Sequence, residues 1–218
     1  MKTPLTKKEL LVAIGEEVEE DNVEILEQTE THTLIFDMLD EKSVCFNYSE
    51  AINLNWLTNK IYINPKAKHK FNLNAKEIAR ILLLNLPTEY FTTLSKVYFI
   101  YKYNDIRKIA KDIYEDEHSE VAFDYDEFFE NQCGLMFWEH NCVFINLRVI
   151  EKVSKEVFPE NPSSEITRGL WSTVFHEFRH LLLDTNIFLS EDEYPKELSK
   201  EENVEEFGNE TMENMKIK

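Results

Sequence analysis

The stretch WSTVFHEFRHLLLD, residues 171–184, combines a helical pattern of apolar residues with the motif HExxH. Residues four apart on a helix lie on one face, so His176 and His180 can present two imidazole nitrogens to one zinc ion. Glu177 lies beside this face, where it can act on a zinc-bound water without binding the metal itself. The stretch therefore predicts a zinc site with two histidine ligands and Glu177 as general base.

The residues around the motif predict a half-buried helix from about Ser164 to Leu183. The apolar positions of this helix are Trp171, Val174, Phe175, Phe178, Leu181 and Leu182. The histidine face continues through Thr173 and Gly169, whose small side chains leave space for a metal and a substrate. Arg179, inside the motif, is expected to point to solvent or to pair with a nearby carboxylate.

A zinc ion held by two histidines needs a third protein ligand and keeps a fourth position for water. The continuation HExxHxxGxxH is excluded, because positions 183 and 186 are leucine and asparagine. An acidic helix is expected to start near Ser199, with Glu201 and Glu205 on one face. Gly208 lies seven residues after Glu201, at a position where a side chain would obstruct close helix packing. Both glutamates are candidates for the third ligand.

Two motifs of this chain together resemble the gluzincins, metallopeptidases that carry HExxH on one helix and a ligand glutamate on a second. The first is HEFRH at residues 176–180. The second is Glu201-x-x-x-Glu205-x-Phe207-Gly208, which is similar to the ExxxDxFG helix of thermolysin-type enzymes, with glutamate in place of aspartate. It is also similar to the ExxxNxFA helix of the ImmA/IrrE-type regulatory peptidases. The resemblance is confined to the C-terminal part of the chain.

The resemblance implies a role for each residue of the site. His176, His180 and Glu201 would bind Zn²⁺, and Glu177 would be the catalytic base. Glu205 would orient a ligand histidine without touching the metal. The resemblance supplies no match for the group that stabilises the oxyanion, for which His140, Tyr194 and Arg179 are the candidates.

The expected fold class is α+β and zincin-like, with a small mixed sheet, an antiparallel hairpin packed on the HExxH helix, and a following ligand helix. The hairpin consists of Gly134–Glu139 and Cys142–Leu147, joined at His140 and Asn141. In zincin folds a strand at this place is the edge strand that pairs with the substrate backbone.

The rest of the chain alternates between helical and strand patterns. Helices are expected within Thr6–Gln28, from Asn74 as N-cap to Asn85, over Asp105–Glu117 and around Val149–Val157. Strands are expected at Thr33–Leu39, Ser43–Tyr48, Lys60–Ile63 and Lys96–Tyr103, with a turn at residues 40–42. We expect residues 1–70 to form an N-terminal α+β region of unknown role and residues 71–218 to form the metallopeptidase domain. The alternative is that the whole chain is one continuous domain.

Composition narrows the range of partners. Forty-two acidic and 24 basic residues give a net charge of −18, which repels nucleic acids and anionic lipids. No apolar run has the length of a membrane-spanning helix. The three cysteines and the lack of a secretory signal favour a cytoplasmic location. Only four glycines are present, too few for a glycine-rich nucleotide loop.

These observations favour a zinc-dependent peptidase that acts inside the cell on peptide or protein substrates. We expect it to cleave selected proteins rather than proteins in general. A deformylase is a weaker alternative, with Cys133 as the third ligand, because QCGL at 132–135 departs from the EGCLS-type signature. A protein-binding or sensing module with a zincin-like fold is the alternative outside enzymes. The oligomeric state stays open.

Overall fold

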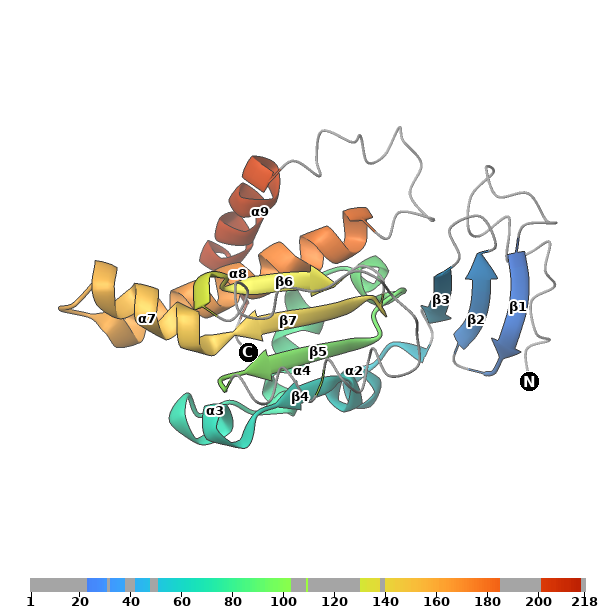
Figure 1. The fold of residues 1–218 in the computed structure, drawn as a ribbon, viewed down its shortest axis with the longest axis horizontal. Coiled ribbons are helices and arrows are strands. Elements are labelled where there is room, and N and C mark those ends of the chain that lie inside the picture. The colour runs from blue at the N-terminus through green and yellow to red at the C-terminus, as the bar shows by residue number, and fades with distance from the viewer. Residues whose placement is uncertain are drawn as a thin grey trace.

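The computed structural model describes residues 23–30, 32–37, 42–47, 51–102, 109, 130–137, 140–184 and 201–216. These residues form an α+β structure, as the sequence predicts, and their strands make two separate sheets (Figure 1). The expected helix Asp105–Glu117 lies outside the described residues apart from Ile109, and so do Ser199 and Tyr194.

The smaller sheet is N-terminal and antiparallel. It contains β1 (Val23–Gln28), β2 (His32–Asp37) and β3 (Lys42–Asn47), in that order. The expected helix Thr6–Gln28 is wrong over its last six residues, which form β1. The register runs from Val23 opposite Asp37 to Gln28 opposite Thr33, with an irregularity between Ile25 and Glu27. Pairing with β2 thus decides the conformation of a segment whose glutamates favour a helix.

Asn47 joins the small sheet to the rest of the protein. Its backbone N–H donates to the carbonyl of Thr92 at 2.7 Å. Its buried side-chain amide donates to the carbonyls of Thr92 at 2.9 Å, Leu94 at 3.2 Å and Phe91 at 3.4 Å. The end of β3 is therefore fixed against the segment after the short helix η3 (Thr88–Phe91).

The larger sheet has four strands in the order β4-β5-β7-β6. These strands are β4 (Ile61–Ile63), β5 (Lys96–Ile100), β7 (Cys142–Asn146) and β6 (Gly134–Phe137). β4, β5 and β7 are parallel, and β6 runs antiparallel to β7, which confirms the mixed sheet with its hairpin. Asn141, in the hairpin connection, has a φ of 51°, the left-handed conformation that a tight turn needs. β6 forms one edge of this sheet.

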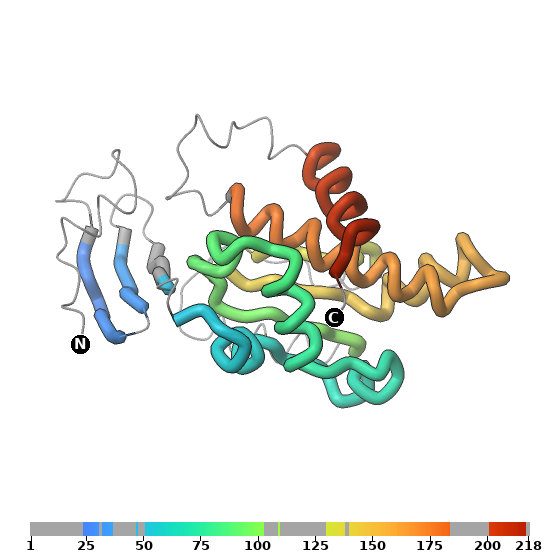
Figure 2. The backbone as a smooth tube through the Cα atoms, turned by 180° about the vertical axis from the view of Figure 1, so that it is seen from behind, coloured from blue at the N-terminus to red at the C-terminus, as the bar shows by residue number. Residues whose placement is uncertain are grey.

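Three helices precede or separate the strands of the larger sheet. α4 (Ala75–Asn85) has Asn74 as its N-cap, as predicted. α2 (Leu54–Lys60) and α3 (Pro65–Lys70) were not predicted, although Asn53 and Asn64 cap them and Pro65 occupies the first turn of α3. Figure 2 shows α2 and α4 on the same side of the larger sheet as the long helix α8 (Pro162–Asp184).

The C-terminal part is helical. α7 (Leu147–Val157) leads into α8 (Pro162–Asp184), which carries HExxH, and α9 (Glu201–Glu213) packs on α8. The apolar side of α8 is buried as predicted, at Trp171, Val174, Phe175, Phe178, Leu181 and Leu182. This side faces β6 and β7, so the sheet covers one flank of α8 and α9 covers another.

One hydrophobic core extends over both parts of the expected domain division. It includes Leu57 of α2, Ile61 of β4 and Ala67 of α3 together with residues of α4, β5, β7 and α8. Residues 51–70 thus share their core with the residues that follow them. Burial of this apolar surface is the main stabilising contribution to the fold.

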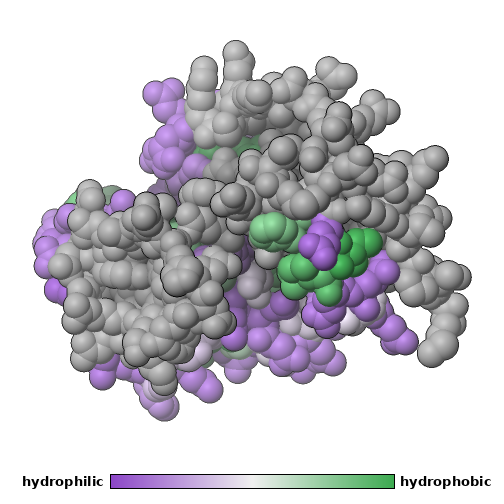
Figure 3. Space-filling view, turned by 45° about the vertical axis from the view of Figure 1, so that its right-hand side comes forward, coloured by the Kyte–Doolittle hydropathy of each residue, from purple (hydrophilic) through white to green (hydrophobic). Residues whose placement is uncertain are grey.

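On the face shown in Figure 3, the coloured residues are mostly hydrophilic, and a compact hydrophobic patch lies among them. Within the described ranges, every helix is too short or too polar to span a bilayer.

Candidate metal centre

His176 and His180 are brought together by a single turn of α8. Their Nε2 atoms lie 3.2 Å apart, and their rings meet at 69° with centroids 4.8 Å apart. The side chains are 18% and 17% exposed, so they are shielded by the fold yet reachable from one side. The i, i+4 spacing therefore places two imidazole nitrogens where one ion can bind both.

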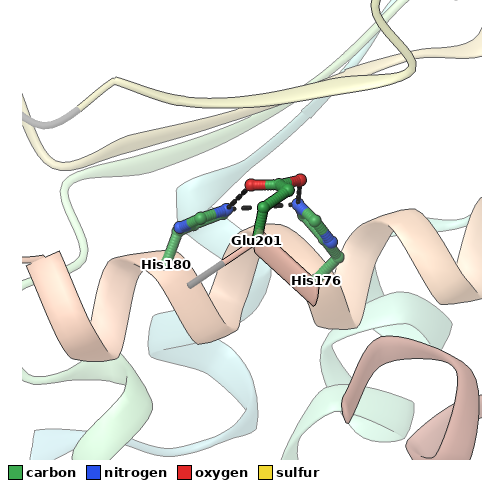
Figure 4. Close-up of side chains that lie close together, drawn as sticks. All are labelled: His176, His180 and Glu201. Atoms are coloured by element: carbon green, nitrogen blue, oxygen red, sulfur yellow. Dashed lines mark hydrogen bonds and ion pairs between the residues drawn. The ribbon is translucent and has the colours of Figure 1, made fainter. Parts of the chain in front are cut away.

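Glu201 reaches the same point from the first residue of α9. Its Oε1 lies 3.1 Å from Nε2 of His176, and its Oε2 lies 3.2 Å from Nε2 of His180. Figure 4 shows the carboxylate across the two imidazoles, with one oxygen directed at each ring. Among the described residues, these three form the group of His, Cys, Asp and Glu side chains close enough together to hold a metal ion.

The donor set and its spacing fit zinc. Two histidines and a glutamate are a known ligand set of catalytic zinc sites. In tetrahedral coordination at about 2.0–2.1 Å, two ligand atoms lie about 3.3–3.4 Å from each other. The separations of 3.1 to 3.2 Å in this cluster are close to that value. Three protein ligands also leave a fourth position for water.

Electrostatics keep His176 in the form that binds metals. Burial lowers the pKa of His176, the Glu201 carboxylate raises it, the neighbouring His180 lowers it and Glu205 raises it. The net effect is a pKa below the usual value of 6.5. At neutral pH the imidazole is therefore uncharged and has a lone pair available.

Glu177 is buried beside the histidines, with 5% of its surface exposed. Its Oε1 lies 4.0 Å from Nε2 of His176. The carboxylate is thus next to the three-residue cluster without belonging to it, as expected for a base that does not bind the metal.

Gly134, the first residue of β6, lies directly over Glu177. A Cβ at this position would be 2.6 Å from Cγ2 of Thr173 and 2.7 Å from Cγ of Glu177, and closer still to Oε1 of Glu177. Only glycine therefore allows the edge strand to approach the base so closely. The sequence analysis missed this role, although a glycine opening a strand in a chain with four glycines is the signal that would have found it.

Gly208 allows α9 to approach α8 at the level of His176. A Cβ on Gly208 would be 2.8 Å from the carbonyl oxygen of Ser172 and 3.2 Å from Cβ of His176. The hydroxyl of Ser172 donates to Oδ1 of Asn209 at 2.7 Å in the same interface. The prediction that a side chain at position 208 would obstruct helix packing is confirmed.

Arg179 fixes the same pair of helices from another side. Its guanidinium lies 4.9 Å from the centre of the Phe207 ring and donates to the Tyr90 hydroxyl at 2.8 Å. Tyr90 in turn stacks on Phe207, with an interplanar angle of 12°. Of the two alternatives expected for Arg179, pointing to solvent is wrong, because its planar cation contacts aromatic rings of η3 and α9. Pairing with a carboxylate stays a prediction.

A cavity of about 670 Å³ opens beside the cluster. It is lined by residues 132–136 of the segment leading into β6, by Ser172, Thr173, His176, Glu177 and His180 of α8, and by Glu201 and Glu205 of α9. The volume is typical of a ligand site. The helix and the edge strand therefore enclose a space in which an extended chain can reach the histidines.

The second candidate ligand, Glu205, lines this cavity and acts on His176 through its charge. Its assignment as the carboxylate that orients a histidine stays a prediction. The third ligand of the deformylase alternative, Cys133, also lines the cavity but lies outside the metal-binding group. Burial and the charge of Glu177 raise the pKa of the Cys133 thiol. The structure thus brings Glu201, and not Cys133, to the two histidines.

Of the three candidates for stabilising the oxyanion, the two that the structure describes, His140 and Arg179, do not line the cavity. His140 stacks on Phe137 at the hairpin, and Arg179 is engaged with Tyr90 and Phe207. Tyr194 lies outside the described residues. The group that would stabilise a transition-state oxyanion therefore stays unassigned.

No protein-family model matches the chain, and neither the curated proteins nor the solved structures include a significant match.

Proposed function

We propose that this protein is a zinc-dependent peptidase with a zincin-like catalytic domain. The observation that carries the proposal is the meeting of His176, His180 and Glu201 from two helices, with donor atoms 3.1 to 3.2 Å apart. The buried carboxylate of Glu177 beside them adds a proton acceptor that the metal does not need as a ligand. A site that only bound a metal ion would not need the carboxylate of Glu177.

Each residue has a defined task in this proposal. His176, His180 and Glu201 hold the ion, which when bound supplies a Lewis acid that polarises a carbonyl and acidifies a water. Glu177 accepts a proton from the attacking water and passes it to the nitrogen of the leaving amine. Its burial limits competition from bulk water for this proton.

The edge position of β6 supports a peptide as the substrate. An extended peptide can add to the free side of an edge strand through main-chain hydrogen bonds. Gly134 places the start of this strand against Glu177, so a peptide paired with β6 would pass the base and the histidines. The free thiols of Cys133 and Cys142 favour activity in a reducing compartment.

The test is a search for new peptide termini. Zinc-loaded protein is incubated with a denatured mixture of proteins, and the cleaved ends are identified by mass spectrometry. The matched control is Glu177→Gln, which preserves the shape of the side chain and removes the base. We expect cleavage by the wild type, equal zinc content in both proteins, and a rate about 10²- to 10⁴-fold lower in the variant.

Two results would contradict the proposal in different ways. Equal cleavage by both proteins would show that Glu177 is not the base. Stoichiometric zinc without any cleavage would favour a binding or sensing module over a peptidase acting on general substrates.

A further inference from the structure

A second cavity lies at the corner between α3 and α4, formed without any residue of the metal centre. α3 ends at Lys70, and the N–H of Leu73 donates to the carbonyl of Lys68 at 3.1 Å. Asn72 has a left-handed φ of 51°. α4 begins two residues later at its cap, Asn74. This tight corner brings the last turn of α3 next to the first turns of α4. The cavity has a volume of about 650 Å³ and is lined by Leu54, Lys68, His69, Asn72, Leu73, Asn74, Lys76, Glu77 and Arg80.

The lining of this cavity is cationic although the protein is strongly acidic. Lys68, Lys76 and Arg80 face a single carboxylate, Glu77, and Arg80 binds that carboxylate at 2.5 Å. Within the described part of the chain, neither Lys68 nor Lys76 forms an ion pair. Acidic residues outnumber basic ones by 42 to 24 in the whole chain. Two lysines without an ion pair beside one cavity therefore make its local charge opposite in sign to that of the protein.

Neighbouring lysines of the same helix behave differently. Lys70 binds Glu151 and the Tyr101 hydroxyl, each at 2.5 Å, and Lys66 lies 5.0 Å from the centre of the Tyr101 ring. These two face β5 and α7, whereas Lys68 lies at the cavity. Among the described residues, Lys66 and Lys70 of α3 therefore have partners away from the cavity, and Lys68 forms no ion pair.

We infer that this corner cavity binds a small organic molecule carrying two or more phosphate groups. The ammonium groups of Lys68 and Lys76 match the multiple charges of such a ligand, which a single carboxylate or chloride would not satisfy, whereas Arg80 already binds Glu77. Leu54 and Leu73 offer an apolar surface for the organic part, and the volume suits a small molecule. The backbone N–H groups of Lys76 and Glu77 already bind Asn74, so the recognition comes from side chains.

The overall charge favours a small ligand over a nucleic acid. Electrostatic fields are screened over about 8 Å at physiological salt, so the local cations dominate inside the cavity. A polymer of phosphates would extend past that distance and meet the surrounding acidic surface, which is part of a net charge of −18.

The test is isothermal titration calorimetry of the full chain with inorganic pyrophosphate and with adenosine diphosphate. We expect one saturable site, with adenosine diphosphate bound more tightly than pyrophosphate because its organic part contacts the leucines. The double variant Lys68→Met, Lys76→Met should weaken both affinities by about 10- to 100-fold, as loss of charge-assisted hydrogen bonds predicts. The matched control is Lys102→Met, Lys152→Met, which removes the same charge elsewhere and should change the affinities less than twofold.

A further variant separates this cavity from the metal centre, because pyrophosphate also binds zinc. His176→Ala should bind pyrophosphate as tightly as the wild type. Loss of binding in His176→Ala would assign the phosphate to the metal and overturn the inference. No saturable binding to the wild type, or equal affinities of the two double variants, would also overturn it. If adenosine diphosphate bound more weakly than pyrophosphate, the inferred contact between the leucines and an organic part of the ligand would be wrong.

Discussion

Two carboxylates of this protein, Glu151 and Glu201, each meet nitrogen atoms from other elements, and their surroundings are opposite. The Glu151 side chain is 9% exposed and accepts hydrogen bonds from Lys70 and Lys155 at 2.5 Å and from Tyr101 at 2.7 Å. The Glu201 side chain is 71% exposed and faces the imidazoles of His176 and His180.

The difference lies in the charge that the nitrogens bring. Burial alone would raise the pKa of Glu151, but the hydrogen bonds from Lys155, Lys70 and Tyr101 outweigh it and lower the pKa to about 2. Its cluster is complete without any other ion. The imidazole of His176 is uncharged at neutral pH, so Glu201 adds a negative charge to nitrogen lone pairs. A donor set of this kind favours a cation, whereas the Glu151 cluster links α3, α7 and Tyr101, the residue that follows β5.

The largest expected effect separates the two clusters by metal content. His176→Ala and Glu201→Ala should each lose stoichiometric zinc, because two remaining ligands rarely hold the ion. Glu151→Gln should keep one zinc per folded chain. Elemental analysis of the purified proteins measures this directly. Equal zinc in all three variants would place the metal elsewhere.

The second prediction concerns stability in acid. Because the pKa of Glu151 is lower in the folded protein than its usual 4.5, the unfolded chain binds more protons between these values. The contribution of Glu151 is therefore complete above about pH 5 and is lost as the pH falls toward 2, by about 3 kcal/mol in total. Denaturant unfolding of the zinc-free protein and of Glu151→Gln at several pH values tests it. The two proteins should differ in stability at pH 6 and converge at low pH, and a constant difference would contradict the assignment.

The third prediction ranks the two glutamates of α9. Glu205→Ala should weaken zinc affinity by about 10- to 100-fold, the usual effect of losing a carboxylate that supports a ligand, whereas Glu201→Ala removes the site. Zinc titration with a competing chelator measures both. Glu206→Ala, an exposed neighbour on the same helix, is the control and should leave the affinity unchanged. If Glu205→Ala lost zinc and Glu201→Ala kept it, Glu205 would be the ligand.

The smallest expected effect uses two helical glycines. Gly208→Ala would place its Cβ 2.8 Å from the Ser172 carbonyl, so α9 must shift, at a cost of about 1–3 kcal/mol of stability and with weaker zinc binding. In Gly169→Ala the nearest atom, Cγ2 of Ile150, is 3.4 Å away. Alanine is favoured over glycine in a helix, so this control should be neutral or more stable by about 0.5 kcal/mol. Thermal unfolding with and without zinc measures both, and equal behaviour would contradict close packing at Gly208.

Local patterns predicted the metal cluster better than the Glu151 cluster. HExxH places His176 and His180 within one turn of α8, and the second motif identified Glu201 and Gly208 from spacing along one helix. One partner of Glu151, Lys155, is a local i+4 neighbour, but Lys70 and Tyr101 are 81 and 50 residues away in the chain. No local periodicity connects such residues, so only the folded arrangement of α3, β5 and α7 reveals the link.

The same physical limit explains the errors in the fold. α4, β6 and β7 were predicted because their caps, turns and apolar patterns are local. β1 was expected to be helical, because its glutamates suit a helix and its conformation is decided by pairing with β2. α2 and α3 are short, and their signals are the caps Asn53 and Asn64 rather than a hydrophobic period.

Glu201 opens α9, and His180 lies near the end of α8, so a metal bound by both connects the two ends of the intervening segment 181–200. This makes the ion a reversible crosslink in the polypeptide. The free energy that α9 contributes to holding the metal equals the free energy by which the metal holds α9 in place. With free zinc at 1,000 times its dissociation constant, that linkage amounts to about 4 kcal/mol. If the protein binds zinc as proposed, the supply of zinc would change its stability as well as its chemistry, because release of the ion would remove one of the contacts that hold α9 on α8.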